Sequence, residues 1–257
     1  MLNYIRSEFY RIFRSRAFYV TLAVFMGLPV AVNGLLLFFA HNDASFPYAI
    51  TSFSYSNFVA NPMWMAYSAL LVSFILYDGT RRNGALKNVV ALGIDRMKIF
   101  VGQCIVATVI CSLILLGTLM TYVGSAELLL QTAGPIVWQD VFETAAVGYL
   151  IGVSAVVLSI TLLIVMYTDW SSILLFFAVF EFIPLAFFLL GLKFTGLQEV
   201  ALWMPKNFFD LMHTVNMSNF EPVWQTADGL EKCLISGLAG IVIFGLVGLW
   251  RIRKKEV

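Results

Sequence analysis

The chain has 257 residues, of which 60% are hydrophobic and 12% are charged, and its formal net charge is +1. Soluble domains carry about 25% charged and about 45–50% apolar residues, so this composition excludes an ordinary soluble enzyme, a disordered chain and a disulfide-rich secreted scaffold. It leaves a polytopic membrane protein, and the small net charge gives no indication of a nucleic-acid partner.

The first predicted element is an amphipathic helix within residues 1–17. At about 100° per residue, its apolar side chains fall on one face and its arginines on the rest. The apolar set is Leu2, Ile5, Phe9, Ile12 and Phe13, and the basic set is Arg6, Arg11 and Arg14. Such a helix lies in the headgroup plane before the chain enters the bilayer, and the alternative is a simple basic anchor. A cleaved signal peptide is disfavoured, because the following apolar run exceeds the about 7–15 residues of an h-region.

Six apolar runs follow, each long enough to cross the hydrocarbon core, which needs about 20 residues. They are Phe18–Ala40, Val59–Tyr77, Ile99–Val123, Ala145–Tyr167, Ser172–Leu192 and Cys233–Trp250. None shows the alternation of a β-barrel strand, and each is apolar all round, as a buried or membrane helix is. The predicted fold class is an all-α polytopic membrane protein, with six transmembrane helices in a single transmembrane domain over 1–257.

The basic residues predict which side of the membrane each connection faces. Residues 1–17, 78–98 and 251–257 together hold thirteen of the sixteen Lys and Arg residues. Because basic loops stay on the cytoplasmic side, six crossings place both termini and the segment 78–98 in the cytoplasm. Five or seven crossings would divide the basic clusters between the two sides.

The segment 78–98 is predicted to contain a short helix of its own. Asn83 is suited to cap its N-terminus, Gly93 to end it, and Asp95 to start the next helix. A connection between two helices needs only about 2–8 residues. A structured element in a segment of this length indicates that a partner docks there.

The run NGALKNVVALGIDR in this segment resembles the first cytoplasmic loop of permease subunits of type-2 ATP-binding-cassette (ABC) exporters. The matching positions are Asn83, Gly84, Leu86, Lys87, Asn88, Gly93 and Arg96, while Ala85 and Asp95 depart from the family pattern. The segment with Glu8, Phe9, Arg11, Arg14 and Arg16 resembles the interfacial connecting helix of that family. The nearest resemblance is to small permeases for the export of, and immunity to, bacteriocins, lantibiotics and antimicrobial peptides.

The resemblance implies that the loop helix is a coupling helix, which rests in a groove of a separate ATPase subunit. The chain would be a transport subunit and not an enzyme. It would move an amphipathic peptide, or a related hydrophobic compound, out of a bacterial cell across the plasma membrane. ATP and Mg²⁺ would bind the partner ATPase, and the sequence agrees in lacking the motif G-x-x-x-x-G-K-[ST]. No cofactor is expected on this chain, and a second permease chain, identical or sister, would complete the pathway.

One carboxylate, Glu181, lies well inside a predicted span, three residues before Pro184. A charge at that depth costs at least about 2.5–3.5 kcal/mol on insertion scales. Two interpretations stay open: a group that faces the transport pathway, or a protonated carboxyl bonded to a neighbouring helix. Pro184 is predicted to kink the span. The segment 193–232 is predicted to be an outer re-entrant cap, with a hairpin resting on the outer surface as the alternative.

Other features favour structural roles. Gly148 and Gly152 form a GxxxG pair that permits close helix packing. The three cysteines have no CxxC spacing, and His41 and His213 have no ligand spacing, so no metal site is predicted. An integral-membrane enzyme is disfavoured by the absence of HExxH and GxSxG patterns. The alternative function is an ion-coupled secondary transporter of a hydrophobic solute. Such a transporter is expected to have more charged residues within its spans.

Overall fold

The computed structural model describes residues 1–43, 45–82, 93–166 and 168–254, with the backbone alone over 76–82. The helices are α1 Leu2–Phe13, α2 Arg16–Asn42, α3 Thr51–Val59, α4 Trp64–Arg82, α6 Arg96–Leu129, α7 Trp138–Val165, α8 Asp169–Phe177, α9 Ile183–Gly191, α10 Thr195–Ala201, α11 Pro205–Met212 and α12 Ala227–Lys254. A π-helical turn, η1 Ala178–Phe182, joins α8 to α9, and a 3₁₀ turn, η2 Val223–Gln225, precedes α12. The strands β1 Thr214–Val215 and β2 Phe220–Glu221 form a small antiparallel hairpin.

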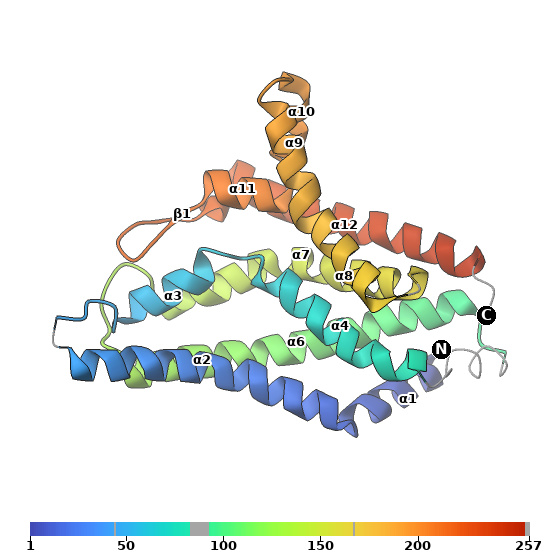
Figure 1. The fold of residues 1–257 in the computed structure, drawn as a ribbon, viewed down its shortest axis with the longest axis horizontal. Coiled ribbons are helices and arrows are strands. Elements are labelled where there is room, and N and C mark those ends of the chain that lie inside the picture. The colour runs from blue at the N-terminus through green and yellow to red at the C-terminus, as the bar shows by residue number, and fades with distance from the viewer. Residues whose placement is uncertain (44, 83–92, 167, 255–257) are drawn as a thin grey trace.

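Long apolar helices dominate the chain. Within the described residues, five helical segments are long and apolar enough to cross a membrane: α2, α6, α7, the run from α8 to α9, and α12. A sixth is added if α3 and α4 are counted as one bent span. The chain is therefore an all-α protein with the helices of a multi-pass membrane protein. In Figure 1 α2, α6, α7 and α12 run along the long axis, while α8, η1 and α9 project away from them toward α10.

The second span differs from the uninterrupted helix predicted over Val59–Tyr77. Helix α3 ends at Val59, α4 begins at Trp64, and the two meet at 69°. The sequence Asn61-Pro62 lies at this break. Proline has no N–H to donate, and it disfavours the helical conformation of the residue before it, so the helix ends here and restarts.

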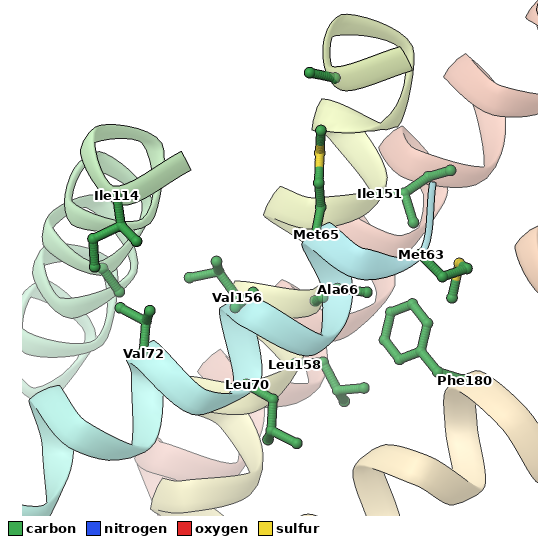
Figure 2. Close-up of a cluster of buried hydrophobic side chains, with 14 of the residues drawn as sticks. Met63, Met65, Ala66, Leu70, Val72, Ile114, Ile151, Val156, Leu158 and Phe180 are labelled. Carbon is green, nitrogen blue, oxygen red and sulfur yellow. The ribbon is translucent and has the colours of Figure 1, made fainter. Parts of the chain in front are cut away.

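Helix α7 forms the centre of the bundle, and 78% of its most apolar stretch is buried inside the protein. Helix α4 packs between α7 and α6. Figure 2 shows Met65, Ala66, Leu70 and Val72 of α4 close to Ile151, Val156 and Leu158 of α7 and to Ile114 of α6. Gly148 and Gly152 lie against the Met65 side chain, so the GxxxG pair packs within the chain.

Helix α12 approaches α7 closely through its glycines. A Cβ atom added to Gly237 would lie 2.5 Å from the Cβ of Leu150 and 2.8 Å from its carbonyl carbon. A Cβ at Gly240 would lie 2.8 Å from the Cβ of Ser154. Because these neighbours are backbone or near-backbone atoms, the contact requires glycine, as in other close helix crossings in membranes.

The first helix has the amphipathic pattern that the sequence predicted, and part of its apolar face packs on protein. Ile12 is buried and Phe13 stacks edge-on against Phe18 of α2 at 5.4 Å. Tyr4 is also buried, against the position of Gly102 on α6. The N-terminus, the C-terminal end of α12, the end of α4 and the start of α6 lie at the same end of the molecule (Figure 1).

Candidate functional site

Glu181 lies in the π-helical turn η1, and the nearby proline accounts for that turn. Pro184 has no N–H and its ring excludes a regular turn against the carbonyl of residue 180. The chain instead makes an i to i−5 bond, in which the N–H of Ile183 donates to the carbonyl of Ala178. The structure thus has a π turn before Pro184, the predicted kink of the span stays a prediction, and π turns are frequent at functional sites.

The carboxylate of Glu181 meets two side chains from distant parts of the sequence. The hydroxyl of Tyr67, on α4, donates to its Oε1. The Nζ of Lys206, on α11, lies 2.7 Å from its Oε2. The side chains of Glu181 and Lys206 are 21% and 26% exposed, so the pair is only partly shielded. The contact with Tyr67 agrees with a bond from Glu181 to a neighbouring helix, and Lys206 adds an ion pair, while the predicted protonation of Glu181 and its predicted role in a transport pathway stay predictions.

Lys206 also has a second acceptor. The Oδ2 of Asp210, one helical turn along α11, lies 3.4 Å from its Nζ and belongs to a side chain that is 62% exposed. The hydrogen bond to Glu181 is the main cause that raises the pKa of Lys206 above its ordinary value, with the charges of Asp210 and Glu181 adding to it. The lysine is thus a cation shared between two carboxylates.

Helix α11 bonds to both interrupted spans. At its N-terminal end, the buried Nδ2 of Asn207 donates to the carbonyls of Pro184, at 2.8 Å, and of Ala201, at 3.0 Å. At its C-cap, the Nε2 of His213 lies 2.8 Å from the carbonyl of Val59, where α3 ends. The carbonyl of Val59 stands at the end of a helix, where the usual donor of the next turn is missing, and in a membrane protein such a donor must be replaced from within the protein.

The ring of His213 is held in one tautomer by its two partners. The carbonyl of Val59 can only accept, so Nε2 carries the hydrogen, and Nδ1 accepts from the N–H of Val223 at 3.2 Å. Phe209 and Trp224 pack beside the ring. Burial in this surrounding lowers the pKa of His213 below its ordinary value, which favours the neutral ring that both bonds need.

An apolar cavity of about 490 Å³ lies between α2, α4 and α6, with α3 at its edge. Its lining includes Pro29 and Leu28 of α2, Trp64 and Tyr67 of α4, and Leu115 of α6. A cavity of about 300–1,000 Å³ is the size of small-molecule sites. Tyr67 therefore takes part in both features: its ring lines the cavity and its hydroxyl bonds Glu181.

Most of the residues that the sequence assigns to ATPase coupling lie outside the described residues, namely Asn83, Gly84, Leu86, Lys87 and Asn88. Gly93 is described and has a φ of +82°, a conformation that glycine adopts without strain. Arg96 is the first residue of α6, and the side chain of Asp95 caps that helix by accepting from the N–H of Met97. The helix start predicted at Asp95 is confirmed.

The residues of the predicted interfacial helix lie on or beside α1. Glu8 and Arg11 form an ion pair at 2.6 Å, and Phe9 is half-buried and stacked on Phe13. Arg14 lies 4.7 Å from the centre of the Tyr10 ring, and Arg16 is exposed at the start of α2. This geometry fits a basic helix at a membrane surface, and its part in coupling stays a prediction.

Sequence reasoning missed the partners of Glu181 and a second polar cluster. Asn33 of α2 is fully buried; its Nδ2 donates to the Oγ of Ser125 at 2.8 Å, and its Oδ1 accepts from Ser54 at 2.7 Å. An asparagine within an apolar run was the available signal for this cluster, because polar groups at membrane depth need partners. No comparable signal marked Tyr67 or Lys206 as partners of Glu181.

The described residues contain no group of three or more His, Cys, Asp and Glu side chains arranged to hold a metal ion. Comparison of the chain with protein-family models, with curated proteins and with solved structures gave no match. The function is therefore argued from the site and the sequence pattern alone.

Proposed function

We propose that this chain is the membrane permease subunit of an ABC exporter, which moves an amphipathic peptide or a related hydrophobic compound out of a bacterial cell. A separate ATPase subunit supplies the energy. The ATPase docks on the segment 78–98, which includes Arg96, and its conformational change is transmitted to the spans through that segment. A second permease chain completes the pathway. Both termini and this segment then face the cytoplasm, as the distribution of Lys and Arg favours.

The observation that carries this proposal is that α1, the start of α6 and the described end of α12 lie together at one end of the molecule. Helix α1 packs on α6, where Tyr4 meets the position of Gly102. The end of α12 reaches the start of the same helix, because the Nε of Arg253 donates to the Sδ of Met97 at 2.9 Å. In the sequence, the proposed coupling segment 78–98 includes Arg96, the first residue of α6. A force applied to that segment would therefore reach α1, α6 and α12 together.

The interrupted spans support a transport role as well. Broken helices within membrane proteins are tolerated where they are buried in protein or line a cavity, and they mark binding sites in many transporters. Here the break at Asn61-Pro62 and the π turn at Glu181 both lie near the cavity wall that Trp64 and Tyr67 form. An apolar cavity beside these breaks suits a hydrophobic cargo.

The test is reconstitution of this chain in lipid nanodiscs with the P-loop ATPase that co-purifies from its native membrane. We expect ATP hydrolysis to rise when an amphipathic peptide is added. Arg96→Glu should lower the stimulated rate and the ATPase affinity about tenfold, which corresponds to about 1.4 kcal/mol. Lys193→Glu is the matched control, because it makes the same charge change between α9 and α10 and should leave both unchanged.

Two outcomes contradict the proposal. One is an Arg96→Glu variant that binds and stimulates the ATPase as the unmodified chain does. The other is transport by the purified chain that needs a proton gradient and no nucleotide. The second outcome would instead support an ion-coupled secondary transporter.

A further inference from the structure

We propose that Glu181, the aromatic side chains beside it and the cavity between α2, α4 and α6 form one binding site for a cationic amphiphile, and that Lys206 occupies the position of the ligand's cation when the site is empty. The inference rests on the proposed function, since it names the chemical class of the cargo. Its binding step, however, is testable without any ATPase.

The cavity accepts a hydrocarbon chain. Two of its lining hydroxyls are bonded within their own helices: those of Ser68 and Thr118 donate to the carbonyls of Met65 and Ile114, at 2.9 and 2.8 Å. These groups have no remaining hydrogen to offer a ligand. Apart from Asn57, whose Nδ2 donates to the carbonyl of Phe53 at 2.8 Å, the remaining lining residues are aliphatic or aromatic, so most of the contact for a guest is apolar.

The end of the site near Glu181 has the chemistry of an ammonium site. The Tyr67 ring is stacked near Phe177 at 6.0 Å and meets Trp64 edge-on at 6.5 Å. Aromatic faces attract organic cations through their negative π surface, and a carboxylate beside them adds a full opposite charge. Tyr67 joins this end to the cavity, because its ring lines the cavity and its hydroxyl bonds Glu181. A ligand that fills both parts has an apolar chain and a cationic head.

In the empty site, the ammonium group of Lys206 occupies the position proposed for the ligand's cation. Its Nζ lies 2.7 Å from Glu181, and its second acceptor, Asp210, is 3.4 Å away on the same helix. When a ligand cation takes Glu181, the lysine keeps an ion pair by moving wholly to Asp210. The exchange therefore leaves no charge without a partner. An unpaired charge in a partly buried site would be costly. An anionic amphiphile would meet the carboxylate without such compensation.

The experiment compares two fluorescent probes with the same dodecyl chain, one ending in trimethylammonium and the other in sulfonate. Binding is measured by fluorescence anisotropy to the purified chain in nanodiscs of zwitterionic lipid, with no nucleotide present. We expect the ammonium probe to bind the unmodified chain at least about tenfold more tightly than the sulfonate probe, a difference of about 1.4 kcal/mol.

The variants have opposite expected signs. Lys206→Gln removes the competing cation and should tighten binding of the ammonium probe about tenfold. Glu181→Gln should abolish the preference for the ammonium probe, and Asp210→Asn should weaken ammonium binding because Lys206 then stays on Glu181. Lys193→Gln is the matched control for Lys206→Gln, since it removes a lysine from the same outer segment and should change nothing.

A cavity variant keeps the proposal testable if Glu181→Gln fails to fold. Leu28→Trp fills the cavity from the α2 side, where the side chain is 61% exposed, and should weaken both probes equally. The proposal is overturned if Lys206→Gln weakens ammonium binding, or if Leu28→Trp changes neither probe. If the ammonium probe binds selectively but no ATPase responds to the chain, the binding site is supported and the exporter function is contradicted. If peptides stimulate the ATPase regardless of their charge, the exporter function is supported and the cationic binding site is contradicted.

Discussion

Two spans of this protein contrast in how they are built. Helix α7 runs unbroken from Trp138 to Val165, and 78% of its most apolar stretch is buried among other helices. The span from α8 to α9 contains a π turn, and only 17% of its most apolar stretch is buried. Yet the span from α8 to α9 contains Glu181 and accepts the hydrogen bond from Asn207 of α11. The comparison indicates that α7 and its neighbours form the packed core of the fold, while the interrupted span holds a polar contact with α11.

The largest expected loss of stability comes from disturbing the contact between α7 and α12. Gly237→Ala places a Cβ atom 2.5 Å from the Cβ of Leu150 and 2.8 Å from its backbone, so α12 must move away from α7. We expect a loss of about 3 kcal/mol in the free energy of unfolding, at the upper end for overpacked sites. Detergent unfolding followed by circular dichroism measures it.

Gly245→Ala is the matched control on the same helix, because among the described residues the added Cβ would meet only the Cγ1 of Val157, at 3.9 Å. Alanine also has the higher helix propensity, by about 1 kcal/mol. This variant should be neutral or slightly stabilising. Equal losses at both positions would mean that the α7–α12 contact is not the source of stability.

A smaller loss is expected where α11 binds the interrupted span. Asn207→Leu keeps the size of the side chain and removes the donor for the carbonyls of Pro184 and Ala201, at a cost of about 2 kcal/mol. Asn42→Leu removes a similar bond to the carbonyl of Phe38 at an exposed site and should cost little. Thermal unfolding in detergent compares the two. If Asn42→Leu costs as much, the buried position of Asn207 is not what matters.

The ion pair at Glu181 should contribute less, because both side chains are partly exposed. Lys206→Met is expected to lower the free energy of unfolding by about 1–2 kcal/mol, between the values for exposed and buried pairs. Glu181→Lys combined with Lys206→Glu reverses the pair and should recover part of the loss of either single change. A double variant that is worse than both single variants would contradict a direct interaction.

The smallest expected effect is the pH dependence that His213 confers. Its pKa in the folded chain lies below the ordinary value of 6.5, so the unfolded chain binds a proton more readily. The stability that the neutral ring contributes is present above pH 6.5 and is lost as the pH falls from there through the folded pKa. We expect a loss below about 1 kcal/mol between about pH 7.5 and about pH 5.5. In His213→Phe the melting temperature should change less with pH over this range. If it changes with pH as much as in the unmodified chain, another group causes the effect.

Much of the fold could be predicted from the sequence. The apolar runs, the amphipathic first helix and the helix start at Asp95 follow from local composition and spacing, because the cost of placing a residue in the bilayer is paid largely residue by residue. The sequence also located Glu181 and Pro184. The break at Asn61-Pro62 had a local signal that the hydropathy pattern alone did not reveal.

The partners of these residues were decided only in three dimensions. Tyr67 stands 114 positions before Glu181, and Lys206 belongs to the outer segment 193–232, where hydropathy predicts only a cap region or a surface hairpin. They meet because α4 restarts after its break and α11 packs across the π turn before Pro184. Composition identifies which side chains need a partner at membrane depth, but the packing of helices far apart in the sequence determines which partner they find.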